Sequence, residues 1–149
     1  MAHSNHSVRS TMEQQTVELV QGTWKSVAAI APQAAELFYQ NLFEADPRLK
    51  PLFKGNMPEQ GKKLMQMIGA AVGKLNDLRT LVPILENLGK RHVAYGVKDE
   101  HYATVGGALL KTLEQGLGEA FTPEVKAAWA SVYGVMADVM IAASKGGAG

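Results

Sequence analysis

The chain has 149 residues and a formal net charge of +1, with 46% hydrophobic residues, 19% charged residues and no cysteine. This length suits one domain with a sizeable core, and the composition is that of a globular protein rather than a disordered chain. The charge balance argues against a nucleic-acid-binding surface. The lack of cysteine excludes disulfides, cysteine nucleophiles and iron–sulfur clusters held by the chain's own thiolates.

The two ends of the chain are polar or glycine-rich. We expect residues 1–11 to be a flexible lead, residues 12–145 to form the folded domain and residues 146–149 to be a flexible tail. The first ten residues lack the apolar middle of a signal peptide, and no apolar run approaches the length of a membrane span. We therefore expect a cytoplasmic protein without a membrane-spanning segment.

The first half of the chain is patterned as three helices. Ser10 and Glu13 have capping-box spacing, and an apolar stripe at spacings of three and four follows them. Pro32 suits the first turn of a second helix, Pro47 marks its end, and Pro58 suits the first turn of a third. Residues between the second and third helices are expected to be irregular. The three stripes are Val17, Val20, Trp24 and Val27; Leu37, Phe38, Asn41 and Leu42; and Leu64, Ile68, Ala71 and Leu75.

The second half is patterned as three further helices. Asp77 precedes the first of them, Gly96 separates it from the next, and Gly118 lies near the end of that one. Thr122 followed by Pro123 predicts a capped start for the last helix. No alternating strand pattern of useful length is present, so the expected fold is all-α with six or more long helices and short loops. The stripes are Val105, Leu109 and Leu113, then Val125, Trp129, Val132, Met136 and Val139.

An imidazole interrupts the apolar face of the fourth long helix. Leu85, Leu88 and His92 fall on one face at spacings of three and four. Because burying an unpaired imidazole costs free energy, a partner is expected opposite His92, and a metal held by one axial histidine is one candidate. On this spacing alone, a hydrogen-bonded core histidine is the commoner explanation.

Four blocks stand out in the sequence: Leu37–Phe43 with Pro47, Gln60–Leu64, Gly89–His92, and His101–Tyr102 with Val105–Gly106. Taken together in this order, they resemble the globin family. The resemblance is to bacterial single-domain haemoglobins and to the haem domain of flavohaemoglobins, and it covers about residues 16–141. It implies a globin fold around a haem pocket and a b-type haem (iron protoporphyrin IX) as cofactor. It also implies dioxygen, carbon monoxide and nitric oxide as ligands.

On the proximal side, the resemblance assigns His92 as the single protein ligand of the haem iron. Leu88 on the same helical face and Tyr102 complete the expected proximal contacts. In flavohaemoglobins a glutamate in the last helix accompanies this tyrosine, and the matching position here is Ser144. Weaker electron push from the histidine toward the iron is therefore expected.

On the distal side, the resemblance implies that Tyr39, Gln60 and Leu64 face the bound gas and that Phe53 packs on the haem face. Lys63 could reach a haem propionate. Dioxygen at a haem iron carries partial negative charge, and the hydroxyl of Tyr39 and the amide of Gln60 are donors worth roughly 1–3 kcal/mol each. Tight oxygen binding follows. The ordinary alternatives are a core role for Tyr39 and Phe53, and exposure to solvent for Gln60 and Lys63.

Two classes of function remain from the sequence. The first is a haem-based oxygen-binding protein, for storage, scavenging or transport of oxygen, with oxidation of nitric oxide to nitrate, and so its removal, as a further candidate activity. Such enzyme activity would depend on a separate reductase, because no glycine-rich nucleotide-binding fingerprint follows a strand. The pair Gly106-Gly107 is better explained by close helix packing. The alternative is a haem gas sensor or signalling module without catalysis.

Overall fold

The computed structural model describes residues 13–53, 55–94 and 96–146. The expected lead and residues 147–149 of the expected tail lie outside these ranges, as does Ser10 of the predicted capping box. Gly146, which we assigned to the tail, is the last residue of the final helix. The first described helix begins at Gln14.

The described part of the chain is all-α, as predicted, and contains no strand. Short connections join the six α-helices of the described ranges, and a 3-10 helix lies at two of these connections. In chain order the elements are α2 (Gln14–Ala28), α3 (Ala31–Ala45), η1 (Pro47–Leu52), α4 (Met57–Gly73), α5 (Leu78–Ala94), α6 (Asp99–Leu117), η2 (Gly118–Ala120) and α7 (Pro123–Gly146).

Local signals explain most of the helix boundaries. Pro32 lies in the first turn of α3, as predicted. Thr122 caps α7, because its Oγ1 accepts a hydrogen bond from the backbone N–H of Val125 at 3.2 Å. The segment after α3 differs from the prediction, since it forms the 3-10 helix η1 instead of irregular chain. The Asp46 carboxylate caps η1 by accepting from the backbone N–H of Arg48 at 3.1 Å.

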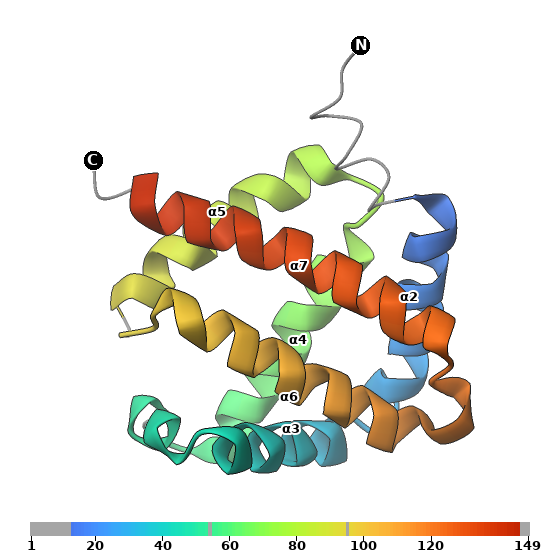
Figure 1. The fold of residues 1–149 in the computed structure, drawn as a ribbon, viewed down its shortest axis with the longest axis horizontal. Coiled ribbons are helices and arrows are strands. Elements are labelled where there is room, and N and C mark those ends of the chain that lie inside the picture. The colour runs from blue at the N-terminus through green and yellow to red at the C-terminus, as the bar shows by residue number, and fades with distance from the viewer. Residues whose placement is uncertain (1–12, 54, 95, 147–149) are drawn as a thin grey trace.

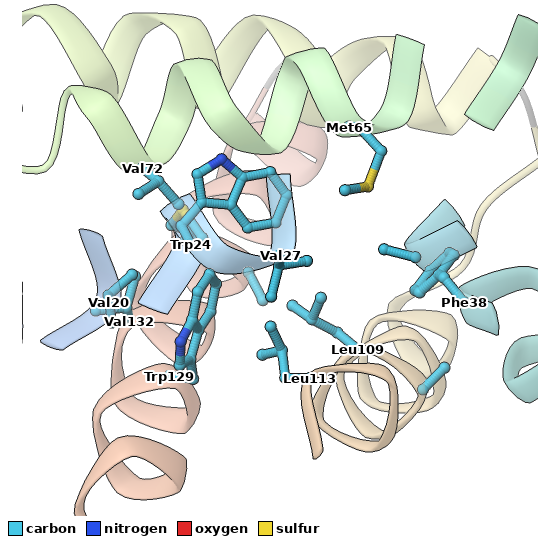
Figure 2. Packing of buried hydrophobic residues seen from close by; sticks show 14 of the residues in the cluster. Val20, Trp24, Val27, Phe38, Met65, Val72, Leu109, Leu113, Trp129 and Val132 are labelled. Atoms are coloured by element: carbon cyan, nitrogen blue, oxygen red, sulfur yellow. The ribbon is translucent and has the colours of Figure 1, made fainter. Parts of the chain in front are cut away.

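The core is centred on two tryptophans. Trp24 of α2 and Trp129 of α7 lie with ring centroids 6.1 Å apart. Around them Val20, Val132 and Leu113 fill the space between the helices (Figure 2). The indole N–H of Trp129 donates to Thr23 Oγ1 at 2.9 Å, which satisfies the buried polar end of this ring. Burial of such large side chains is worth roughly 3–5 kcal/mol each against alanine.

The long helices cross in two layers (Figure 1). α6 and α7 lie side by side, α3 packs against α6, and α5 packs against α7. Two buried polar side chains, Asn41 and Thr112, meet between α3 and α6. The Asn41 amide donates to Thr112 Oγ1 at 3.0 Å and to Gln115 Oε1 at 2.9 Å. Helix α4 packs against both α3 and α2.

Helix α7 corrects one expectation from the sequence. Its segment Pro123–Lys145 has 23 residues and a mean hydropathy of 1.3, so by length and composition it could cross a membrane. The expectation that no apolar run reaches that length was wrong. The same segment supplies Val125, Trp129 and Val132 to the core and packs against α2, α5 and α6. Only 28% of the apolar window of this segment is buried in the structure, so this packing accounts for part of its apolar composition.

Candidate functional site

His92 lies on α5 with Leu85 buried and Leu88 half-buried on the same face, as the spacing predicted. Its ring Nδ1 donates to the carbonyl oxygen of Leu88 at 2.7 Å. Because a carbonyl oxygen can only accept, the proton lies on Nδ1 and the lone pair on Nε2. Burial lowers the pKa of His92, partly offset by the bond to Leu88, and the nearby Arg91 lowers it further. The imidazole is therefore held neutral and in one tautomer.

Tyr102 of α6 lies beside His92, with ring centroids 6.2 Å apart. The side chain is buried, and its hydroxyl has no hydrogen-bond partner among the described residues. Burial raises the pKa of Tyr102, and so does the charge of Asp99, so the group stays a neutral donor. An unpaired buried hydroxyl is costly, which makes this position receptive to a polar group from outside the described chain.

Ser144 does not supply that partner. Its Oγ donates to the carbonyl oxygen of Ile141 on its own helix, at 2.7 Å. The neighbouring Lys145 forms an ion pair with Asp99 at 2.9 Å and so ties the end of α7 to the start of α6. The position that the resemblance matched to a carboxylate therefore leaves the Tyr102 hydroxyl without a charge to bond.

Tyr39 of α3 belongs to a cluster of aromatic rings. Its centroid lies 5.4 Å from Phe53, in an edge-to-face arrangement, and 5.9 Å from Phe43, in a stacked one. Tyr39 is 8% exposed, and burial raises its pKa, so its hydroxyl stays protonated. Phe53 follows η1 and is half-buried. The structure thus brings Tyr39 and Phe53 together, and their expected roles beside a haem remain predictions.

Gln60, Lys63 and Leu64 lie on α4 in three different environments. Leu64 is half-buried and packs against the core, and Lys63 is exposed. Gln60 is half-buried, and its Nε2 lies 3.6 Å from where a Cβ on Gly55 would be. The amide of Gln60 therefore lies along the segment that precedes α4, so the exposure given as its ordinary alternative is only partial.

A cavity of about 1040 Å³ lies between α2, α3 and α4. Trp24, Tyr39, Gly61 and Met65 are among its lining residues, whereas Gln60, Leu64 and His92 are not. The cavity thus lies on a different face of α4 from the face that carries Gln60 and Leu64.

A family model described as Globin matches residues 36–140. The chain belongs to the globin family. It is 35% identical to the neuroglobin of Tetraodon nigroviridis over 133 residues, covering 80% of this chain and 84% of the relative. It is 31% identical to the flavohemoprotein of Bacillus subtilis (strain 168) over 139 residues, covering 90% of this chain and 34% of the relative.

A solved bacterial globin from Campylobacter jejuni has the same fold as this chain. The two are 27% identical with a TM-score of 0.78, covering 90% of this globin and 97% of the other. The family and fold predicted from the four sequence blocks are thus confirmed. The chain spans about a third of the flavohemoprotein that it matches, so the resemblance there concerns one part of a longer protein. The roles of the individual site residues remain predictions.

Three residues of this globin, Gly106, Tyr133 and Gly61, make close contacts between helices. A Cβ on Gly106 would lie 2.7 Å from the ring of Tyr133, which confirms close helix packing there, whereas Gly107 meets nothing within 4 Å. The same Tyr133 donates its hydroxyl to the backbone carbonyl of Tyr102 at 2.6 Å. A Cβ on Gly61 would lie 2.9 Å from that of Ala35, so α3 and α4 touch beside Gln60. The sequence predicted no role for Tyr133 or Gly61. For Gly61, a glycine inside a predicted helix was the signal of a close contact.

Proposed function

We propose that this globin binds one b-type haem (iron protoporphyrin IX) with His92 as the axial ligand of the iron. The observation that carries the proposal is the hydrogen bond from His92 Nδ1 to the Leu88 carbonyl. That bond places the lone pair on Nε2, and burial keeps the ring neutral, which is the form that binds a metal.

The surrounding residues fit such a group. Phe53, Leu64 and Leu88 are half-buried apolar side chains that pack against the core and would contact an apolar ring system. The buried Tyr102 hydroxyl lacks a partner within the described chain, and the ring of Tyr102 lies beside that of His92. The ammonium of Lys63 is exposed and suits a propionate at the rim.

The proposed function is tight binding of dioxygen, with carbon monoxide and nitric oxide as further ligands. A bound haem would supply reversible binding of these diatomic gases. The chain would supply hydrogen-bond donors to the partly negative dioxygen, namely the hydroxyl of Tyr39 and, by rotation of its side chain, the amide of Gln60. Two donors of roughly 1–3 kcal/mol each favour retention of dioxygen over rapid release.

Oxidation of nitric oxide is the finer part of the proposal. One dioxygen, one nitric oxide and one electron make one nitrate, so each cycle consumes an electron. We propose that a separate reductase supplies it. The likeness to a flavohemoprotein supports a reductase as the source of the electron.

Two measurements on the purified protein test the proposal. The visible spectrum of the reduced protein, with and without oxygen, should show a haem band that changes with the gas. Excess nitric oxide, added under air with NADH but no reductase, should then yield about one nitrate per haem and stop. No haem band would overturn the whole proposal. Sustained NADH-driven turnover would overturn the need for a reductase, and no nitrate at all would favour storage or sensing.

A further inference from the structure

The backbones of α5 and α7 meet at Gly89. A Cβ placed on Gly89 would overlap the carbonyl oxygen of Met140, and it would lie 2.8 Å from both the carbonyl carbon and the Cα of that residue. Gly89 and Met140 are both buried. The atoms in the way belong to the main chain, so they cannot rotate aside as the end of a flexible side chain can. Any side chain at position 89 therefore requires α5 to move relative to α7.

One peptide unit connects this contact to His92. The carbonyl oxygen of Leu88 and the Cα of Gly89 belong to the same planar peptide group, so they move together. That oxygen is the atom that accepts the hydrogen bond from His92 Nδ1 at 2.7 Å. A displacement of Gly89 away from α7 thus tilts the group that orients the imidazole.

We infer that Gly89 is a positioning residue for His92: its contact with the Met140 main chain fixes the Leu88 carbonyl and, through it, the plane of the imidazole. The inference rests on the proposed role of His92 as the haem ligand. Gly89 acts only through its neighbours in this arrangement. Its function is to be the one residue small enough to let the two helices touch one turn before the ligand.

Gly134 offers a matched control on α7. A Cβ there would meet nothing within 4 Å. Gly134→Ala and Gly89→Ala make the same chemical change inside a helix, and that change by itself favours the helix. Only the variant at position 89 disturbs the contact between α5 and α7.

The experiment compares the two variants as reduced holoproteins by resonance Raman spectroscopy. Gly89→Ala should shift or split the iron–histidine stretching band and raise the rate of haem loss by roughly threefold to tenfold. Gly134→Ala should leave both unchanged. An unchanged band in Gly89→Ala would overturn the inference, even if that variant were less stable.

A second background tests whether the effect passes through the tethered imidazole. In His92→Gly protein supplied with free imidazole, the ligand is no longer attached to α5. Adding Gly89→Ala should then leave the iron–imidazole band in place, and an equal shift in both backgrounds would contradict a positioning role.

Met140→Ala provides a variant that adds no bulk at the contact. It removes the side chain while keeping the main chain that Gly89 touches, so the band should stay in place. A shifted band would show that general packing, rather than the main-chain contact, orients His92. This variant decides the question if Gly89→Ala does not fold.

Thermal unfolding of the apoproteins separates the two possible failures. If the parent holoprotein shows no iron–histidine band, the proposed function fails and the positioning role falls with it. A lower unfolding temperature in Gly89→Ala alone would then show that the helix contact exists without a haem role.

Discussion

The two sides of the candidate site are held by different kinds of contact. On α5, a main-chain carbonyl orients His92, and that main chain rests directly on α7. On α3 and α4, the contacts are made by side chains: aromatic rings pack around Tyr39, and the amide of Gln60 lies beside Gly55. Main-chain contacts between helices allow one arrangement, whereas a side chain on one helix can change rotamer at small cost. We expect the α5 side to determine whether haem is retained and the α3–α4 side to set how fast the bound gas dissociates.

The largest effect should come from His92→Ala. This change would remove the proposed axial bond from His92 to the iron, so the purified variant should be apoprotein or hold haem weakly. Haem content and the Soret band after gel filtration measure this. His101→Ala is the matched control, because His101 accepts a hydrogen bond from the backbone N–H of Lys98 at a helix start. An unchanged Soret band in His92→Ala would rule out the assignment.

Tyr39→Phe should come next, and it probes the opposite side. The change removes one hydroxyl and keeps the ring among Phe43 and Phe53, so packing is nearly preserved. Loss of about 1.4 kcal/mol should raise the rate of oxygen dissociation roughly tenfold. Carbon monoxide gains less from donors and should respond less. Stopped-flow measurements of the dissociation rates of oxygen and carbon monoxide test this prediction. Tyr133→Phe, which removes a hydroxyl between α6 and α7, is the control.

Equal effects of Tyr39→Phe on oxygen and carbon monoxide would mean that this tyrosine acts through shape alone. The expected contrast between the two sides would then be reduced to packing differences.

Gln60→Leu should have a smaller effect on oxygen release than Tyr39→Phe. The amide of Gln60 lies along Gly55, so reaching the gas requires rotation of its side chain, which costs part of the hydrogen bond's free energy. An increase of roughly threefold in the off-rate is the expected result, from the net worth of about 0.5–1 kcal/mol left to the bond. A change larger than that of Tyr39→Phe would show that Gln60 is the principal donor.

Ser144→Glu should have the smallest effect and should act on the α5 side. A carboxylate at this position could accept a hydrogen bond from the Tyr102 hydroxyl, which has no partner in the described chain. A modest rise in the iron–histidine stretching frequency should follow, if Tyr102 passes the charge on to His92. Ala142→Glu, at an exposed position of the same helix, is the control. A frequency equal in both variants would show that Tyr102 does not connect the two groups.

Short sequence signals correctly predicted helix starts, because a helix start depends on interactions between neighbouring residues. Pro32 and the Thr122-Pro123 pair marked helix starts because their effect depends on the adjacent backbone only. The 3-10 helix η1 was missed, since Pro47 marks the end of one helix and equally well the start of a tighter one.

The contacts that position the site were beyond the sequence because they join distant segments. The sequence around Gly89 does not indicate which segment packs against it, and its partner, the main chain of Met140, lies far along the chain in α7. The hydrogen bond from Tyr133 to the Tyr102 carbonyl likewise depends on how α6 and α7 cross. The resemblance to globins supplied candidate residues, and the helix packing supplied their orientation.

The buried amide of Asn41 has a consequence for how uniformly the molecules behave. Its two hydrogen bonds, to Thr112 and Gln115 on α6, can form together in only one sliding and rotational register of α3. Tyr39 lies half a turn earlier on that helix, so its hydroxyl has the same position relative to α6 in every molecule. Oxygen release from the population should therefore follow a single exponential. Replacing Asn41 with leucine would keep the core apolar but permit several registers, and the release would then spread into several phases.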